Sequence, residues 1–440
     1  MRTPAALWPR GGLWEHADFL KFWTAQTVSQ FGSQVSVIAL PLVAVTVLHA
    51  SAFQVAALGA VDFAPFLLFS LPAGVWVDRL PRRPILFTAD FGRVIALGSI
   101  PLAAALGHLT LAQLYVVGFV AGTLTVFFDV SYQSYLPSLV DRAQLVEGNA
   151  KLEASRSAAQ IGGPGTGGLL VKAFTAPYAI IADAASFLWS ALFLFAIDRR
   201  ETLPERAAGG TSMYRELVDG LKYLVRHRYW RPISISTATF NFSNNVAFSI
   251  LFVYAVRRLH MSALAIGVTF ALSNGGALLA ALLAKRIGTR LGVGRTIILG
   301  ALVDSLPLVL VPLAPISFPI PFLVASFTLV GFGVVLYNVT AISLTQALVP
   351  ERLLGRVNAS RRFIVWGTIP LGALVGGGLA TWIGLRPTMF VGTLAATLCV
   401  LPLVLSSLRS LESMPEQPEE GPAIDALLPT EAAGLMPESG

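Results

Sequence analysis

The chain consists of long apolar runs separated by short polar loops. Twelve runs approach the about 20 apolar residues that a helix needs to cross the hydrocarbon core of a bilayer. They lie at residues 20–48, 54–77, 84–107, 110–136, 151–174, 177–197, 231–256, 263–286, 295–314, 319–347, 357–383 and 387–407. The run at 151–174 is the weakest, because Lys151, Glu153 and Arg156 occupy its first turns. The pattern predicts an all-α membrane protein with twelve transmembrane helices.

The longest polar break divides the spans into two sets of six. The expected parts are a cytoplasmic N-terminal segment, an N-terminal six-helix half, a cytoplasmic linker, a C-terminal six-helix half and an acidic disordered cytoplasmic tail, at 1–18, 19–197, 198–230, 231–408 and 409–440. Apolar residues recur on one face of 213–229, which predicts an amphipathic helix along the membrane surface. Charged residues interrupt the first eighteen positions, so we expect no cleaved signal peptide.

Composition and charge agree with this reading. Charged residues make up 12% of the chain, whereas soluble domains carry roughly 25%, so a soluble enzyme, a nucleic-acid-binding protein and a disordered protein are excluded. With the N-terminus in the cytoplasm, 26 of the 31 lysines and arginines fall on the cytoplasmic side and 4 on the opposite side. This asymmetry follows the positive-inside rule and predicts that both termini are cytoplasmic. Orientation in a membrane therefore accounts for the net charge of +7.

Few residues suit cofactor or metal chemistry. The single cysteine, Cys399, excludes an intramolecular disulfide and a cysteine-based metal cluster, and the five histidines show no paired spacing. The chain has no phosphate-binding loop of the Gly-x-x-x-x-Gly-Lys-Ser/Thr type. We therefore expect no enzyme activity, no cofactor, no metal, no ATP and no nucleic-acid partner.

The two halves share a sequence pattern. A proline, an acid followed by arginine, an Asn-Ala pair and a further arginine recur in the same order after the fourth and tenth spans, at Pro137, Asp141-Arg142, Asn149-Ala150 and Arg156, and at Pro350, Glu351-Arg352, Asn358-Ala359 and Arg361. Such internal repeats are typical of secondary transporters, which bind substrate between the repeats. The pattern predicts two pseudo-symmetric halves around a central site.

The loop after the second span combines a glycine, an acid and three arginines at fixed spacing, Gly74, Asp78, Arg79, Arg82 and Arg83. Gly74 would allow a close helix approach, and Asp78 would pair with a base or cap a helix and so latch the cytoplasmic side. A positive-inside loop with one acid is the alternative. The spacing resembles the loop signature of the major facilitator superfamily, with Pro81 in place of the usual glycine.

The fifth span contains Gly163-Pro164-x-x-Gly167-Gly168. The proline breaks the helical hydrogen-bond ladder, and the glycines allow tight packing against a neighbouring helix. A packing kink without any further role is the alternative. The element resembles the Gly-Pro-x-x-Gly motif that marks antiporters of that superfamily, which implies export.

The segment 127–137, with Asp90-x-x-Arg93 and 358–361, resembles the bacterial exporter branch that contains the enterobactin exporter and macrolide-efflux proteins. The resemblance covers residues 15–408 and implies a monomer in the bacterial inner membrane. Its activity would be alternating-access export of a siderophore, an antibiotic or a similar small molecule, driven by proton antiport. The fourth span lacks the membrane arginine of many proton-driven antiporters, and Arg93 is a candidate substitute. The expected cytoplasmic gate comprises Gly74, Asp78, Arg79, Arg82, Arg83, Asp90, Arg93 and Asp129.

Polar residues inside the spans are candidates for the remaining roles. Asp62 and Asp304 lie near mid-membrane and are candidate proton-coupling residues, with a hydrogen-bonded structural acid as the alternative. Four amides at similar depth in the equivalent first and seventh spans are candidates for cavity lining, with helix–helix hydrogen bonding as the alternative, at Gln26, Gln30, Asn241 and Asn245. Aromatic walls for a large amphipathic substrate are expected from Trp23, Phe240, Phe242 and Trp366.

Two other functions remain open from the sequence. The nearer one is a nutrient importer or permease on the same fold. The more remote one is a non-transporting polytopic membrane enzyme or assembly partner, which would need a catalytic His, Asp or Ser cluster at a membrane face. The histidines fall singly in loops, which disfavours it.

Overall fold

The computed structural model describes residues 12–77, 80–141, 144–198, 201, 222, 226–349 and 351–413, without the side chains of 71, 75, 346, 351–359 and 361–364. This part of the chain is almost entirely helical and contains no strand. The N-terminal half follows the short 3₁₀ helix η1 (Gly12–Glu15) and consists of α1 (Ala17–Leu42) with the π-helical turn η2 (Val43–Val47), α2 (Ala52–Val77), α3 (Arg82–Ala105), α4 (Leu111–Leu139), α5 (Leu145–Phe174) and α6 (Ala176–Phe195).

The C-terminal half is divided into more helices, several of them short. It consists of α8 (Trp230–Phe248), α9 (Leu251–Arg257), α10 (Ala263–Ser273), α11 (Gly275–Leu291), α12 (Val293–Ser305), η4 (Leu306–Val309), α13 (Leu310–Leu313), α14 (Pro319–Leu348), α15 (Glu351–Ile383), α16 (Leu385–Thr397), α17 (Val400–Val404) and η5 (Ser407–Ser410). The helices within a predicted span follow one another closely, as α8 and α9 do.

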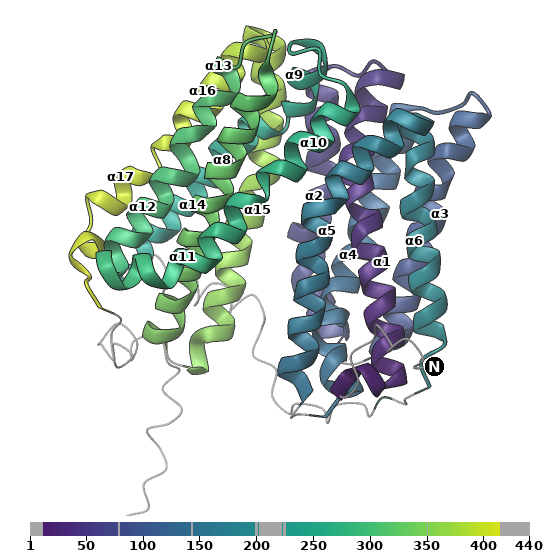
Figure 1. The fold of residues 1–440 in the computed structure, drawn as a ribbon, viewed down its shortest axis with the longest axis horizontal. Helices are drawn as coiled ribbons and strands as arrows, with labels where there is room; N and C mark the ends of the chain where they lie inside the picture. The colour runs from purple at the N-terminus through teal and green to yellow at the C-terminus, as the bar shows by residue number, and fades with distance from the viewer. Residues whose placement is uncertain are drawn as a thin grey trace, which may run out of the picture.

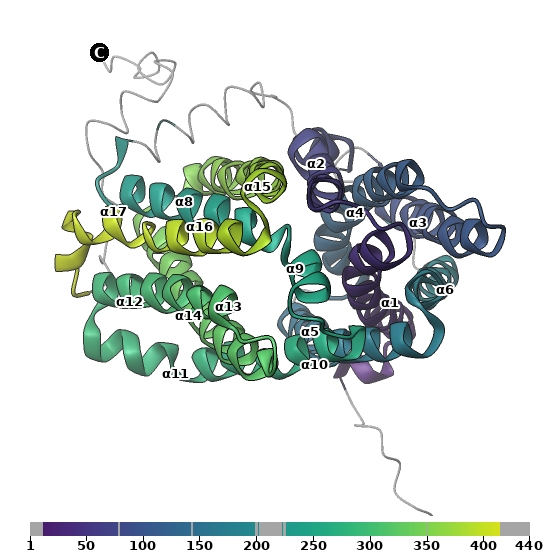
Figure 2. The ribbon, with the colours of Figure 1, turned by 90° about the horizontal axis from the view of Figure 1, so that it is seen from above.

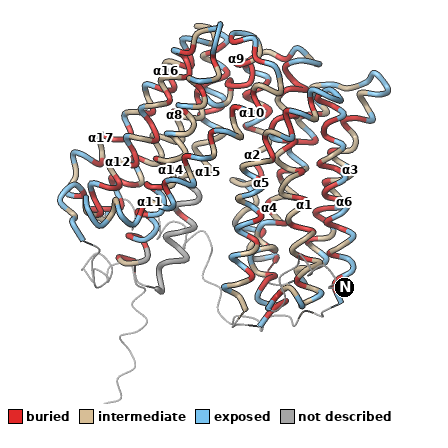
Figure 3. The backbone as a smooth tube through the Cα atoms, viewed as in Figure 1, coloured by how far each residue is buried: buried red, intermediate tan, exposed pale blue. Residues whose placement is uncertain are grey.

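Ten helical stretches of the described chain are long and apolar enough to cross a membrane. The two other predicted spans correspond to α5 and α15, which are 30 and 33 residues long and carry charged residues in their first turns. The arrangement is therefore consistent with the predicted twelve spans. Several large apolar side chains are exposed, among them Trp382, Leu405 and Leu282. Figure 3 shows that exposed positions recur along helices of both halves. Such a surface is unfavourable in water but matches the hydrocarbon of a bilayer.

Four of the spans expected to be continuous are interrupted. α10 ends at Ser273, where Asn274, Gly275 and Gly276 follow, and both asparagine and glycine are poor helix formers. Two other breaks, between α12 and η4 and between α16 and α17, have a proline close by, Pro307 and Pro402, which cannot donate the backbone hydrogen bond that a helix needs. The fourth break lies between α8 and α9. Interrupted membrane helices place backbone polar groups inside the protein, where they need partners.

The ends of several helices are set by local residues. Thr110 and Ser262 cap α4 and α10 by accepting hydrogen bonds from the backbone N–H groups of Gln113 and Ala265, both at 3.2 Å. Gly292, with φ of 81°, forms the sharp turn between α11 and α12, a backbone conformation that favours glycine.

The start of the predicted disordered tail is ordered in the structure. The 3₁₀ turn η5 extends to Ser410, and the backbone carbonyls of Leu411 and Glu412 accept hydrogen bonds from Gly294 (2.8 Å) and Val293 (3.2 Å). These bonds satisfy free N–H groups at the start of α12, which is the physical reason that the chain stays packed beyond residue 409. Residues 414–440 and most of the predicted amphipathic helix, 213–221 and 223–225, lie outside the described residues.

The two halves stand side by side, with α1–α6 on one side and α8–α17 on the other (Figures 1 and 2). Two helix pairs make most of the contact between the halves, α2 with α15 and α5 with α10. Counted as spans, the second packs against the eleventh and the fifth packs against the eighth. The internal repeat relates the second span to the eighth and the fifth to the eleventh, so it converts one pair into the other. The packing therefore has the pseudo-symmetry that the sequence predicts.

Candidate functional site between the two halves

The halves touch at one end of the molecule and diverge toward the other. We call the end that carries Gly12–Glu15 and the 80–83 loop the basic end, and the end that carries the connectors around His49 and His260 the far end. In Figure 1, the ribbons of the two halves meet at the far end, at the top, and separate toward the basic end, at the bottom. At the far end the Arg257 guanidinium of α9 donates a hydrogen bond of 2.6 Å to the backbone carbonyl of Ala50.

A set of close backbone contacts joins α5 to α10, and we call Pro164, Gly168, Ala263 and Gly267 the glycine seam. A Cβ atom on Gly168 would lie 2.6 Å from the Ala263 carbonyl oxygen and 3.0 Å from Gly267 Cα. A Cβ on Gly267 would lie 2.9 Å from Gly168 Cα and would also meet the Pro164 carbonyl oxygen. The seam therefore requires glycine at both positions, and its partner helix belongs to the other half.

The remaining glycines of the motif pack α5 against α1 within the N-terminal half. A Cβ on Gly163 would meet the side chain of Gln34, and one on Gly167 would lie 3.2 Å from Val35 Cα. The expected tight packing of this motif is thus present on two faces of α5.

A cavity of about 360 Å³ lies between the halves, and we call it the central cavity. Its lining comes from α1, α5, α8, α9, α10, α11 and α14, with four phenylalanines, Phe248, Phe252, Phe270 and Phe327. The polar lining residues are Gln34, Gln160, Ser273 and Asn274. None of the described residues that line it is charged. Its walls thus offer aromatic surfaces and amide or hydroxyl hydrogen-bonding groups.

Two of the helix breaks border the central cavity. Asn274, at the break between α10 and α11, donates hydrogen bonds to the backbone carbonyls of Gln160 in α5 (2.8 Å) and Phe270 (2.9 Å). Phe248 and Phe252 lie on opposite sides of the break between α8 and α9. Broken helices recur at substrate sites in membrane proteins because their free backbone groups can bind a ligand.

A second cavity, of about 190 Å³, lies in the C-terminal half, and we call it the side cavity. Its lining comes from α8, α14 and α15, namely Trp230, Ile233, Thr237, Tyr337, Asn338, Ala341, Val365 and Trp366. Trp366 also contacts Phe66 of the N-terminal half, with ring centroids 5.2 Å apart. Of the predicted aromatic walls, Trp366 thus lines a cavity, whereas Trp23 donates a 3.4 Å hydrogen bond to the Lys151 carbonyl near the basic end.

The four predicted cavity amides line neither cavity. Gln26 is buried, Gln30 is half-buried, and Asn245 donates a 2.8 Å hydrogen bond to the Asn241 carbonyl of its own helix. The central cavity lies nearer the far end, so the α1 amide that reaches it is Gln34, one turn beyond Gln30. Gln26, Gln30 and Gln34 are spaced four residues apart, so they follow one face of α1. This spacing is the sequence signal from which Gln34 could have been predicted.

Asp90 and Arg93 of the predicted gate lie inside the N-terminal half. They form an ion pair and are almost completely buried, with side chains 0% and 6% exposed. The Arg93 guanidinium lies over the rings of Phe128 (4.4 Å) and Phe187 (4.0 Å), so it connects α3 with α4 and α6. All of these contacts lie within one half, which places the pair in a structural core and not at the interface that a gate would close.

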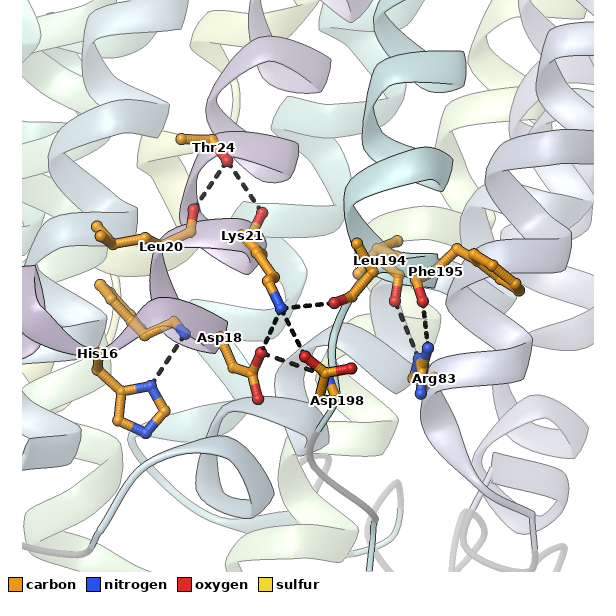
Figure 4. Close-up of polar contacts among 11 residues, drawn as sticks. His16, Asp18, Leu20, Lys21, Thr24, Arg83, Leu194, Phe195 and Asp198 are labelled. Atoms are coloured by element: carbon orange, nitrogen blue, oxygen red, sulfur yellow. Dashed lines mark hydrogen bonds and ion pairs between the residues drawn. The ribbon is translucent and has the colours of Figure 1, made fainter.

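The gate residues of the 74–83 loop also contact their own half. Arg83 donates hydrogen bonds to the backbone carbonyls of Leu194 (3.0 Å) and Phe195 at the end of α6 (Figure 4). The backbone N–H groups of Arg82 and Arg83 donate to the Glu201 carboxylate at 2.6 and 2.8 Å, and so cap α3.

The other members of the predicted gate are dispersed. Among the described residues, nothing lies within 4 Å of a Cβ built on Gly74, so its expected close helix approach is wrong for this conformation. Asp129 is exposed on α4. Asp78 and Arg79 lie outside the described residues.

A second cluster at the basic end was not predicted. The Lys21 ammonium of α1 contacts Asp18 (2.9 Å), Asp198 (3.1 Å) and the Ala196 carbonyl (2.6 Å), as Figure 4 shows. It joins the start of α1 to the end of α6. At this end, the polar contacts found among the described residues connect elements of the same half.

The intramembrane acids differ in their partners. Asp183 accepts hydrogen bonds from Ser36 and Ser186, which matches the structural alternative for buried acids. Within the described chain, neither Asp62 nor Asp304 has an ion-pair partner. Asp304 is 5% exposed, and its buried Oδ1 has no hydrogen-bond partner there. Asp62 lies on α2 where that helix packs against Gly118 and Gly122 of α4.

Comparison with known proteins places this arrangement in a family. Residues 22–369 match the family model of the Major Facilitator Superfamily. The chain is 26% identical to the multidrug efflux pump Tap of Mycolicibacterium fortuitum over 87% of this chain and 94% of that protein.

Solved structures share the fold. One is a bacterial homologue of the iron transporter ferroportin in an inward-facing state, with a TM-score of 0.70 and 16% identity over 89% of this chain and 98% of that chain. Another is the nucleoside transporter NupG, with a TM-score of 0.68 and 12% identity over 88% of this chain and 98% of that chain. The family match covers most of the sequence, and the packing of two repeated halves agrees with it. The chain therefore belongs to the Major Facilitator Superfamily and is a multi-pass membrane transporter for a small molecule.

Proposed function

We propose that this transporter exports an uncharged, amphipathic organic molecule across the bacterial inner membrane in exchange for protons. The observation that carries the proposal is the central cavity, which lies between the two halves and is bordered by helices of both. A site shared by two halves that rock against each other can be opened alternately to the two sides of the membrane.

The charge asymmetry supports an orientation with the basic end in the cytoplasm. In that orientation the glycine seam and the Arg257–Ala50 hydrogen bond close the outer side. The halves diverge toward the cytoplasm, so this conformation is suited to loading a compound from the cell interior.

The lining of the central cavity favours a particular class of transported compound. Its phenylalanines offer apolar and aromatic contacts, and Gln34 and Asn274 offer hydrogen bonds. A multiply charged compound would lose its hydration without gaining a charged partner among the described lining residues. We therefore favour an antibiotic-like amphipathic molecule over an anionic siderophore.

Two observations support export over import. The first is the similarity to a multidrug efflux pump along nearly the whole chain. The second is the Gly163-Pro164-x-x-Gly167-Gly168 element, whose Gly168 packs against α10 of the other half in this conformation. The alternative, a nutrient importer, remains a rival on the same fold, because solved neighbours include a nucleoside transporter.

Proton coupling is proposed from Asp62 and Asp304. Ionisable side chains inside membrane helices are costly, and they frequently mark proton or ion pathways. Neither carboxylate has an ion-pair partner in the described chain, in contrast to Asp90 with Arg93. A carboxylate without a fixed counter-ion can be neutralised by a proton, which is the property that antiport needs.

Inside-out vesicles provide the test of this function. Vesicles with an acidic interior and an entrapped pH-sensitive dye receive erythromycin, enterobactin or the aromatic dye Hoechst 33342. We expect an uncharged or weakly basic compound to accumulate inside while the interior becomes more alkaline, because protons leave in exchange. Accumulation without proton movement would refute antiport, and loss of compound from preloaded vesicles along the proton gradient would favour import.

The same vesicle assay tests the two candidate proton-coupling residues through single substitutions. Asp62→Asn and Asp304→Asn each remove one carboxylate, and vesicles without the protein give the background. We expect at least one of the two variants to abolish compound-dependent proton release. If both retained it, neither carboxylate would be the coupling site.

The central cavity makes a further prediction about affinity. Gln34→Ala should weaken binding of the transported compound by about 1 kcal/mol, roughly a fivefold higher Kd, because one hydrogen-bonding group of the lining is lost. Gln30→Ala is the matched control, since the same amide one turn away lines neither cavity. Equilibrium binding of the compound identified in vesicles measures both. An equal loss for the two variants would place the site nearer the basic end.

A further inference from the structure

The C-terminal half contains a buried polar cluster that the central cavity does not use. Its members are Ser236 on α8, Asp304 and Ser305 on α12, Tyr337 on α14 and Cys399 at the break between α16 and α17. All are less than nine per cent exposed. Polar groups at this depth are costly and usually have a role, so the cluster calls for an explanation.

Glycines place α12 and α14 in direct backbone contact at this cluster. A Cβ on Gly333 would lie 2.7 Å from Asp304 Cα, and a Cβ on Gly300 would lie 2.8 Å from the Tyr337 backbone nitrogen. Gly300 and Asp304 are one helical turn apart on α12. Tyr337 of α14 therefore packs beside Gly300, at a point one turn of α12 away from Asp304.

Tyr337 connects this cluster to the side cavity. Its phenol oxygen lies 2.9 Å from the Thr237 hydroxyl, where either atom can donate, and it can donate to the Ile233 carbonyl at 3.3 Å. Thr237 and Tyr337 both line the side cavity. Two hydroxyls in hydrogen-bond contact thus line the cavity, and Tyr337 packs against the turn of α12 that precedes Asp304.

The side cavity is suited to holding water. It has a volume of about 190 Å³, and its walls include Asn338 and the indole of Trp230, whose buried Nε1 has no hydrogen-bond partner in the described chain. A cavity of this size with several polar groups can accommodate ordered water. Water there would supply protons to the hydroxyl pair.

Among the described residues, the titratable groups near Asp304 are Tyr337 of α14 and Cys399, and α8 contributes the neutral hydroxyls of Ser236 and Thr237 close to them. Lys285, Arg286 and Arg290 of α11 and Arg409 of η5 form no ion pair with Asp304 in the described chain. The carboxylate Oδ1 itself is buried without a partner there. A proton is therefore the available means of neutralising this group.

We propose that Asp304 exchanges its proton with the side cavity through the hydroxyl pair of Tyr337 and Thr237, so that protons and the transported compound use different cavities. In protonation, an excess proton on the water of the side cavity passes to the pair and leaves neutral water behind, the pair passes a hydroxyl proton on, and Asp304 gains it and becomes neutral. The reverse sequence returns the proton to the cavity. This inference rests on the proposed proton antiport and names its route.

Infrared spectroscopy tests the route without any transported compound. In the wild-type protein in liposomes, a pH step should change the C=O band of a protonated carboxylic acid, and Asp304→Asn should lose that component. On transfer to D₂O, the band should shift as its proton exchanges. Tyr337→Phe and Thr237→Val should slow that exchange on the order of a hundredfold, because each removes one relay hydroxyl.

Matched controls separate the route from general structural effects. Tyr254→Phe removes the hydroxyl of another buried tyrosine, in α9, and Thr340→Val removes a buried hydroxyl of α14 that donates to the Leu336 carbonyl of its own helix. Both should leave the exchange rate unchanged. Thermal unfolding of each variant shows that the fold is retained.

The outcomes distinguish this inference from the proposed function. If the carboxylic acid band persists in Asp304→Asn, the assignment of Asp304 is wrong even where vesicles show proton antiport. If proton exchange in Tyr337→Phe and in Thr237→Val is as fast as in the wild-type protein, the route is wrong. If the band and its exchange behave as expected but no compound moves protons in vesicles, the antiport function fails and Asp304 remains a protonation site.

Discussion

Gly168→Ala is expected to reduce the export rate by roughly 5- to 150-fold while the protein still folds. The added methyl group would lie 2.6 Å from the Ala263 carbonyl oxygen and 3.0 Å from Gly267 Cα, both in backbone that cannot move without shifting α10. Overpacking of this kind costs about 1–3 kcal/mol. Because the contact joins the two halves, the added methyl group destabilises the conformation that is closed at the far end. The equilibrium between this conformation and the one that is open there then shifts by about 5- to 150-fold.

Gly165→Ala is the matched control on the same helix and the same interface. Its Cβ would lie 3.4 Å from Ala271 Cβ, which is an ordinary van der Waals contact. Alanine also favours a helix over glycine by about 1 kcal/mol, so this variant should be as stable as the wild type or more stable. Export of the compound identified in vesicles and thermal unfolding in detergent measure both effects. Equal export by the two variants would show that the seam does not control the transport cycle.

Arg93→Leu is expected to destabilise the protein by about 3–5 kcal/mol, the largest stability effect that we predict. It removes the cation from a buried ion pair and leaves the Asp90 carboxylate, which is 0% exposed, without a counter-ion. It also removes the guanidinium from between the rings of Phe128 and Phe187. Titration with a denaturing detergent, followed by tryptophan fluorescence, gives the change in unfolding free energy.

Two companion variants test the cause. Asp90→Asn combined with Arg93→Leu should recover a large part of the loss, because no unpaired charge is left in the core. Arg156→Leu disrupts the exposed 3.5 Å ion pair with Glu153 and should cost about 0–1 kcal/mol. A wild-type stability for Arg93→Leu, together with lost transport, would instead support the gate role predicted from the sequence.

Much of the fold could be predicted from the order of apolar runs. Their length predicts helices that cross a bilayer, and the break at 198–230 predicts two halves. The repeated motif predicts the pseudo-symmetry that the pairing of α2 with α15 and of α5 with α10 displays. The interruption at Asn274 was foreseeable from Asn274-Gly275-Gly276, but the spans were expected to be continuous because apolar composition alone does not reveal a break.

The candidate site was predicted less well, for a geometric reason. Depth in the membrane follows from position in a span, and it brought the prediction of Gln26 and Gln30 close to Gln34, the amide of α1 that lines the central cavity. The direction in which a side chain points depends on how its helix is rotated against its neighbours, and a span that is apolar all around gives no signal for that rotation. Asp90 and Arg93 show the same limitation. Their charge suggested a gate, but the face of α3 on which they lie points into the core of the N-terminal half, where both are buried.

The sequence by itself determined the membrane-spanning class and the division into halves, it indicated the family, and its basic loops predict an orientation that stays a prediction. The class and the halves follow from composition and periodicity, because lipid solvates every outward face alike and the polar loops mark each crossing. The family was indicated by motifs that resemble its signatures. Only the tertiary structure decided that Gly168 contacts Gly267, that Gln34 lines the central cavity and that Tyr337 packs one turn of α12 from Asp304. Those contacts join residues that are far apart in the chain, and close packing between particular helix faces sets them.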